Sequence, residues 1–112
     1  ANNPLWYFQN NEAKEVTANK QPIGKVDNPT SFTTHSIQLN KNDIIYVFTD
    51  GYADQFGGPK GKKFKYKQLK ELIINNASKK MQEQREALVT AFENWKGNLE
   101  QVDDVCIIGV RV

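Results

Sequence analysis

Residues 44–51 read Ile-Ile-Tyr-Val-Phe-Thr-Asp-Gly, an apolar run that stops abruptly at Thr-Asp-Gly. Consecutive apolar residues are typical of a buried central strand, so we predict one over residues 44–49. A second apolar run, residues 105–112, follows a pair of aspartates near the C-terminus. If the two strands are antiparallel neighbours, Asp50 and Asp103 meet at one edge of the sheet. Convergent carboxylates repel each other unless a cation lies between them, so this pattern indicates a site for a hard metal ion.

The composition of the 112 residues is that of a folded protein, because 38% are hydrophobic and 25% are charged. A chain of this length holds one domain at most. The net charge of +2 is too small to indicate nucleic acid as a partner. No stretch approaches the ~20 apolar residues of a membrane span, so we expect no direct membrane insertion. The single cysteine, Cys106, cannot form an intrachain disulfide, which favours a reducing compartment and hence a cytoplasmic location.

The remaining sequence predicts a strand-rich first half, two helices and a final strand. Residues 5–9 are aromatic and strand-like, and residues 13–17 return as their hairpin partner through an Asn-Asn turn. Residues 32–39 partly alternate in polarity, as a half-buried strand does. Apolar residues at helical spacing mark residues 66–76 and a second helix, for which Ser78 is the N-cap and Gly97 the stop. We therefore predict an α+β fold with an antiparallel sheet and two helices.

Several side chains have both a structural and a functional interpretation. Cys106 lies in an apolar run with no group to stabilise a thiolate, so we interpret it as a small core side chain. His35, the only histidine, is interpreted as a core or interface residue because no catalytic motif surrounds it. Asp54, four residues after Asp50, is either a further outer ligand or a turn residue, and we favour the turn residue. Residues 55–65 are rich in Gly and Lys without the spacing of a P-loop, and form either a solvated loop or a cationic rim that attracts phosphorylated substrate.

The order and spacing of several motifs resemble the C-terminal half of a metal-dependent protein phosphatase domain. The motifs are Phe-Thr-Asp-Gly-Tyr-Ala-Asp at residues 48–54, the Gly-rich loop and two helices that follow, and Val-Asp-Asp-Val at residues 102–105. Asn-Asn-Pro-Leu-Trp at residues 2–6 and Gln-Pro-Ile-Gly at residues 21–24 are similar to two further family segments. The chain most resembles the bacterial branch named after the stage II sporulation phosphatase, which is SpoIIE-like and type 2C-like (PPM) in fold. The resemblance covers essentially the whole chain.

This resemblance implies part of a four-layer α/β/β/α sandwich, in which helices cover two antiparallel sheets. It implies hydrolysis of phosphoserine or phosphothreonine with Mn²⁺ or Mg²⁺, by a water that a two-metal site activates. Asp50 and Asp103 correspond to metal ligands of the family. Asp104 is the neighbouring position, and we assign it to hydrogen bonding in the loop or around the metal. Gly51 is included in the metal site because it permits the tight turn that presents Asp50.

The resemblance also implies that the domain is incomplete in residues 1–112. The first half of the family domain carries the aspartate that bridges both metals, in a motif such as Asp-x-x-Gly-His, and no such motif occurs here. The first residues run directly into a strand-like segment, which we interpret as a cut through a longer signalling polypeptide. The isolated chain is therefore expected to be inactive. It is also expected to expose strand edges and an apolar sheet face, and so to form a homodimer or aggregate.

Three functions from different classes follow. The first is the output phosphatase domain of a bacterial signalling protein, with a phosphorylated protein as its substrate. The second is a non-catalytic protein-interaction module on the same fold, in which Asp50 and Asp103 are structural or hold one weakly bound cation. The third is an unrelated small α+β domain whose basic loop binds an anionic partner. A bridging aspartate on the parent chain favours the first, and strongly salt-dependent binding without a need for divalent metal favours the third.

Overall fold

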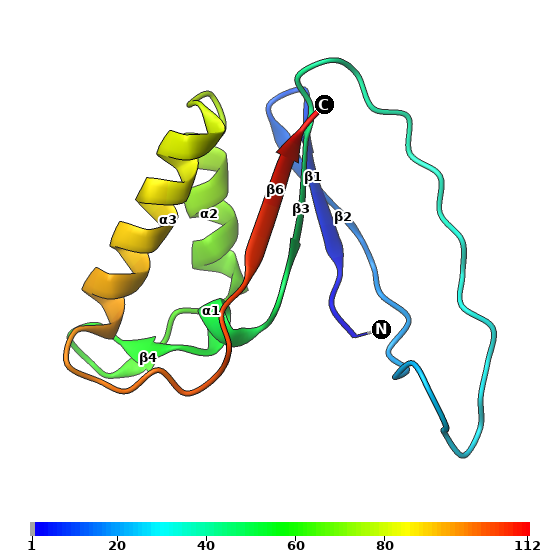
Figure 1. The fold of residues 1–112 in the computed structure, drawn as a ribbon, viewed down its shortest axis with the longest axis horizontal. Helices are drawn as coiled ribbons and strands as arrows, with labels where there is room; N and C mark the ends of the chain where they lie inside the picture. The colour runs from blue at the N-terminus through cyan, green and yellow to red at the C-terminus, as the bar shows by residue number, and fades with distance from the viewer. Residues whose placement is uncertain (1) are drawn as a thin grey trace.

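The computed structural model of the chain describes residues 2–112 and contains a four-stranded antiparallel sheet. The strand order is β2-β1-β3-β6, so β3 lies in the interior of the sheet and β6 lies at an edge (Figure 1). The strands are β1 (Leu5–Gln9), β2 (Glu12–Val16), β3 (Ile44–Phe48) and β6 (Ile107–Arg111). The predicted hairpin, interior strand and final strand are confirmed.

The hairpin of β1 and β2 is closed by two asparagines. Asn10 and Asn11 have φ angles of 53° and 61°, and Gln9 pairs with Glu12 across the turn. Two consecutive residues with positive φ make the kind of two-residue turn whose twist matches that of a hairpin. Asparagine tolerates this backbone region because its short polar side chain bonds locally, which confirms the turn predicted here.

Three helices lie between β3 and β6 in the sequence, namely α1 (Gly51–Asp54), α2 (Tyr66–Asn76) and α3 (Met81–Lys96). A hairpin of two short strands, β4 (Phe56–Gly57) and β5 (Lys62–Lys63), separates α1 from α2. The two longer helices confirm the prediction, whereas α1 and the hairpin occupy the places of an expected turn and loop. Helix α3 begins after Lys80 rather than at Ser78, and ends at Gly97, whose φ of 54° suits glycine. Within residues 2–112, none of the helices is both long and apolar enough to cross a membrane.

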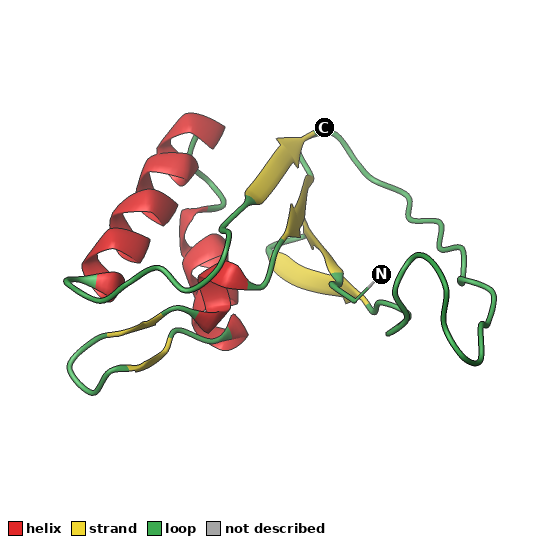
Figure 2. Ribbon diagram, turned by 60° about the horizontal axis from the view of Figure 1, so that its bottom comes forward, coloured by secondary structure: helices red, strands yellow, loops and turns green. Residues whose placement is uncertain are grey.

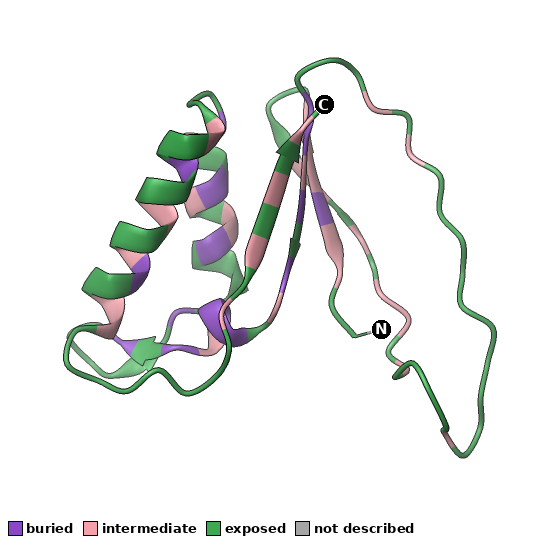
Figure 3. Ribbon diagram, viewed as in Figure 1, coloured by how far each residue is buried: buried purple, intermediate pink, exposed green. Residues whose placement is uncertain are grey.

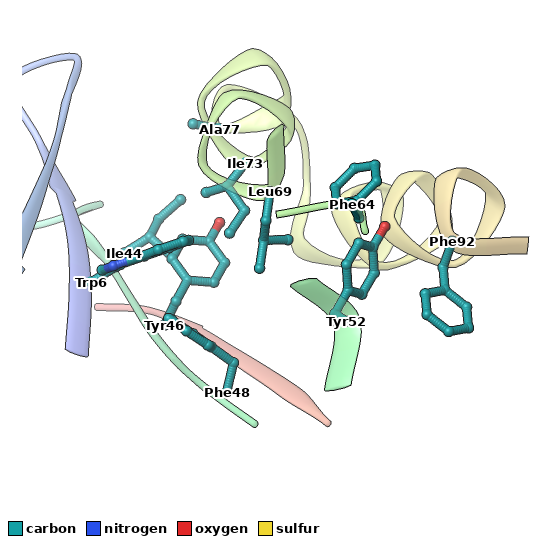
Figure 4. Close-up of a cluster of buried hydrophobic side chains, with 10 residues drawn as sticks. All are labelled: Trp6, Ile44, Tyr46, Phe48, Tyr52, Phe64, Leu69, Ile73, Ala77 and Phe92. Atoms are coloured by element: carbon teal, nitrogen blue, oxygen red, sulfur yellow. The ribbon is translucent and has the colours of Figure 1, made fainter. Parts of the chain in front are cut away.

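The core lies between one face of the sheet and the helices (Figures 1 and 4). Alternate residues of β3 point into it, and the apolar stripe of α3 closes it from the other side, as its helical spacing predicts. The buried side chains are Trp6, Ile44, Tyr46, Phe48, Tyr52, Phe64, Leu69, Ile73, Ala77 and Phe92.

Several polar groups inside this core are paired across elements, whereas Gln55 Oε1 and Arg111 Nε are buried without a hydrogen-bond partner among the described residues. The Tyr46 hydroxyl donates to Oε1 of the buried Gln84 on α3, and burial raises the pKa of Tyr46 to about 12. From β6, Arg111 Nη2 donates to the carbonyl oxygens of Ala77 at 2.7 Å and Lys79 at 3.0 Å. These carbonyls follow α2 and have no partner within the helix, so the last strand stabilises the end of a helix far away in the sequence.

The opposite face of the sheet is uncovered (Figure 3). Val47 is 43% exposed, Ile108 53% and Val110 46%, although the apolar run of β3 predicts burial on both faces. Cys106 is also exposed, and by alternation it lies on the same face as Ile108 and Val110. Its interpretation as a core side chain is therefore wrong. The apolar sheet face expected of half a sandwich is present.

Residues 17–43 form a long arm without helix or strand, which extends from the sheet on the side away from the helices (Figures 1 and 2). The strand predicted over residues 32–39 is absent, and His35 is exposed, so its interpretation as a core residue is wrong. Alternating polarity forms a strand only beside a partner, and no strand of residues 2–112 pairs with this segment. The arm raises the radius of gyration to 15.5 Å, against about 13 Å for a compact domain of this length.

Side-chain hydrogen bonds give the arm its shape. Asn19 Oδ1 accepts from the Thr33 amide at 2.9 Å. Gln21 Oε1 accepts from the amide of Thr30 at 2.9 Å and from its hydroxyl at 3.0 Å. These bonds join the two limbs of the arm, so residues 19–33 turn back on themselves without a strand ladder.

We propose that the isolated chain self-associates through the uncovered sheet face. In a solution of the isolated chain, a second copy is the partner that offers an apolar surface to cover this face. Sedimentation is expected to give a dimer or larger species, because burial of apolar area favours association by about 25 cal/mol per Å². The variant Ile108→Lys/Val110→Lys should shift the distribution to monomer, whereas Ile74→Lys, on α2, should not. A well-folded wild-type monomer at high micromolar concentration contradicts this proposal.

Candidate metal centre

The pairing of β3 with β6 places the two aspartate-bearing segments side by side, where β3 ends and β6 begins. The strands are antiparallel, with Phe48 opposite Ile107. Asp50 therefore follows the end of β3 at the same edge where the segment containing Asp103 and Asp104 enters β6. The antiparallel neighbourhood expected from the two apolar runs is confirmed.

Thr49 joins the two segments by hydrogen bonds just beyond the last paired residues of β3 and β6. Its hydroxyl Oγ1 donates to the carbonyl oxygen of Asp104 at 2.9 Å and accepts from the amide of Cys106 at 3.0 Å. The Thr49 amide also donates to the carbonyl oxygen of Cys106 at 3.0 Å. One residue thus satisfies three polar groups of the opposite segment, so its two neighbours in sequence, Phe48 and Asp50, are held in register with it.

Gly51 is required by a close approach rather than by a turn. A Cβ at this position would lie 2.2 Å from the carbonyl oxygen of Asp104. Gly51 is buried at the first position of α1, and its φ is not positive. The prediction that Gly51 permits a tight turn is therefore wrong. Glycine is needed here because the backbone of Asp104 lies so close that no side chain would fit. Tyr52, the next residue, holds α1 against α3, since its hydroxyl donates to the carbonyl oxygen of Leu88 at 2.7 Å and burial raises its pKa.

The three aspartates present oxygen donors to solvent. All three are exposed, and the Asp50 carboxylate caps no helix amide and pairs with no cation within residues 2–112. Asp103 Oδ1 accepts from the amide of Asp104 at 2.7 Å, which leaves Oδ2 of Asp103 available. Asp104 forms hydrogen bonds through its backbone in this loop.

The donor type fits a hard divalent cation, but the donor number is small. Carboxylate oxygens are the ligands that Mn²⁺ and Mg²⁺ prefer. Across residues 2–112, no group of three or more His, Cys, Asp or Glu side chains is arranged to hold a metal ion. The segments of Asp50 and Asp103 therefore form one side of a site at most.

Further residues lie near the segment of Asp50, and one of them, Tyr66, has no role predicted from the sequence. Burial first, and then the negative charges of Asp50 and Asp54, raise the pKa of Tyr66. Asp54 ends α1 rather than a turn, and its Oδ1 lies 3.7 Å from Nζ of Lys63. This exposed ion pair stabilises the fold little, but it places one lysine of the Gly- and Lys-rich segment beside Asp54, whose amide donates to the carbonyl oxygen of Asp50 at 3.0 Å.

The Gly- and Lys-rich segment is anchored rather than freely solvated. The Trp95 indole donates to the carbonyl oxygen of the fully buried Gln55 at 2.9 Å. A Cβ on Gly57 would lie 1.8 Å from the Trp95 carbonyl oxygen, so only glycine allows the hairpin to lie on the end of α3. The lysines of the hairpin stay exposed. Gly57 and Gly58 thus serve packing against Trp95, whereas the lysines lie on the surface.

Comparisons with known proteins identify the family and the fold of the chain. The family model described as Stage II sporulation protein E (SpoIIE) matches residues 1–112. Among solved structures, the chain is similar to the SiaA-PP2C domain of Pseudomonas aeruginosa, with a TM-score of 0.86 and 26% sequence identity. The similarity covers 97% of this chain but 42% of that one, so this chain spans about two fifths of its solved relative. A search of curated proteins gives no significant match. The predicted α+β fold and the resemblance to a SpoIIE-like, type 2C-like domain are confirmed.

The hydroxyl of Thr49 is expected to stabilise the junction of the two aspartate segments. Thr49→Val keeps the shape of the side chain but removes two hydrogen bonds, so the free energy of unfolding should fall by about 1–3 kcal/mol. Thr49→Ser keeps the hydroxyl and should lose less. Urea denaturation of the three proteins measures the difference, and equal stability of the valine and serine variants would contradict the role given to the hydroxyl.

Proposed function

We propose, on the premise that the chain belongs to the stage II sporulation protein E (SpoIIE) family, that residues 1–112 are the C-terminal portion of a metal-dependent protein serine/threonine phosphatase domain. The family supports a phosphatase in general. The finer proposal is hydrolysis of phosphoserine or phosphothreonine in a protein substrate. The observation that carries it is the contact between the Thr49–Gly51 segment and the Asp103–Cys106 segment, because it joins exposed carboxylates from two distant parts of the chain.

The residues of this chain would each have a limited task. Asp50 and Asp103 would hold Mn²⁺ or Mg²⁺ through carboxylate oxygens, and Asp104 and Thr49 would orient their loop. A bound divalent cation supplies Lewis acidity and neutralises charge on phosphoryl oxygens. Lys63, held near Asp50 through Asp54, adds a positive potential that attracts an anionic substrate. Gly51 contributes by allowing the two backbones to touch.

The remaining ligands must come from outside residues 2–112 in this proposal. The described residues offer no group of three potential ligand side chains, and the solved relative is more than twice as long as the part matched. A bridging aspartate on the rest of a longer polypeptide would complete the two-metal site. We further propose that this polypeptide is a cytoplasmic signalling protein whose output is the phosphatase.

A second candidate function rests on the small number of potential metal ligands among the described residues. If no further carboxylate joins Asp50 and Asp103, the domain would act as a non-catalytic protein-interaction module. The exposed apolar sheet face is the surface that such a module would use. The sequence that accompanies residues 1–112 in the parent polypeptide distinguishes the two functions, since only the phosphatase needs a bridging aspartate.

Asp50→Asn in the full-length polypeptide should abolish Mn²⁺-dependent phosphate release from a phosphoserine peptide. Loss of an outer-shell partner of a metal ligand costs roughly 10–100-fold, so loss of a ligand charge should cost at least that. Asp27→Asn, an exposed aspartate on the arm, is the matched control and should leave turnover unchanged. Equal turnover in a folded Asp50→Asn protein would remove Asp50 from the mechanism.

The isolated 112-residue chain should release no phosphate with Mn²⁺ or Mg²⁺. Two carboxylate segments cannot surround two metal ions, and a hard cation with few protein ligands exchanges readily with water. Titration calorimetry of the isolated chain with Mn²⁺ should accordingly detect weak binding or none. Robust Mn²⁺-dependent turnover by the purified chain would refute the proposal that its site is incomplete.

A further inference from the structure

A groove of about 680 Å³ runs between the N-terminal segment and α2, and none of the aspartates of the metal centre lines it. Its walls include Asn3 before β1, Lys20 at the base of the arm, and Tyr66, Lys67 and Lys70 on α2. Residues 67, 70 and 74 are spaced by three and four, so they share one face of the helix. That face is turned toward the groove, because all three line it.

The groove begins beside the segment that carries Asp50. Tyr66 lines the groove, and its ring centroid lies 5.9 Å from that of Phe48. Asn3, which also lines it, donates from Nδ2 to the carbonyl oxygen of Phe48 at 3.1 Å. Phe48 precedes Asp50 by two residues, so a chain bound with its phosphorylated residue at Asp50 can continue into the groove.

The groove lining carries more positive than negative charge. Lys20, Lys67 and Lys70 line it and form no ion pair within residues 2–112. Two glutamates also line it: Glu15 accepts from the Trp6 indole at 2.9 Å, and Glu71 follows Lys70 on α2. Ammonium groups with free donors beside a phosphate-hydrolysing centre suit carboxylate groups of a ligand.

Lys70 has a fixed position in this groove. Its Nζ lies 5.0 Å from the centroid of the Trp6 ring, a cation–π contact that holds the ammonium over the wall. Trp6 itself is 2% exposed, so its ring is packed in the core and cannot stack on a nucleic-acid base. The groove therefore holds a positive charge at a defined position but exposes no Trp6 ring on which a base could stack. This combination favours an acidic peptide over single-stranded nucleic acid as the ligand.

We propose that this groove binds the stretch of substrate next to the phosphorylated residue and selects acidic side chains there, through Lys67 and Lys70. The proposal rests on the proposed phosphatase function. It assigns specificity, rather than chemistry, to α2, because neither lysine contacts Asp50 or Asp103.

The test compares three substrates of the full-length polypeptide: a phosphoserine peptide flanked by aspartates on both sides, the same peptide flanked by alanines, and p-nitrophenyl phosphate. In Lys67→Met/Lys70→Met, which keeps the aliphatic contacts, kcat/KM for the acidic peptide should fall about tenfold through KM, as expected of two exposed charge contacts. Turnover of the other two substrates should stay unchanged. Lys79→Met/Lys80→Met, at the start of α3 and outside the groove, is the control.

Binding measured separately keeps this test independent of catalysis. Fluorescence anisotropy with the acidic peptide and Asp50→Asn protein should show affinity that falls in the Lys67→Met/Lys70→Met background. Unchanged affinity in the Lys67→Met/Lys70→Met background, or no binding of the peptide at all, would overturn the proposal that the groove binds the substrate. Lysine-dependent binding in a polypeptide that hydrolyses none of the three substrates overturns the phosphatase function and leaves the groove as a peptide site.

Discussion

The antiparallel pairing of β3 with β6 is the constraint on which the rest of the structure depends. It joins Phe48 to Ile107 across almost sixty residues of sequence, and everything between them must leave the sheet and return to it. Helices α2 and α3 therefore pack on one face of the sheet, where they cover the alternate apolar residues of β3. The same pairing brings the Asp50 and Asp103 segments into contact, so core and candidate site have a common origin.

Features that depend on neighbours in sequence could be predicted, and features that depend on a distant partner could not. The Asn10-Asn11 turn and the apolar stripe of α3 are local, because backbone preference and helical spacing act over a few residues. The alternation of residues 32–39 is an equally clear pattern, but a strand also needs hydrogen bonds from another strand. Cys106 was misplaced for the same reason, since its apolar surroundings in sequence do not say whether anything covers that face.

The candidate site divides in the same way. Asp50, Asp103 and Asp104 could be named from motif order, because their spacing from two apolar runs is visible in the sequence. The tasks of Thr49 and Gly51 could not, since both act on the backbone of a segment more than fifty residues away. Tyr66 is similar, because it reads as the start of a helix and becomes part of the site only when α2 is packed against Phe48.

The contact between Gly51 and Asp104 has a consequence for biosynthesis. A ribosome adds roughly 5–20 residues per second, so the segment of Asp103 is made about 3–11 s after Asp50 has left the catalytic centre of the ribosome. Until β6 is made, the β6 side of β3 has no strand to pair with, and Gly51 lacks the backbone carbonyl that it contacts in the folded chain. The nascent chain thus passes through a stage in which its most apolar strand is open to wrong partners, and translation of β6 ends that stage.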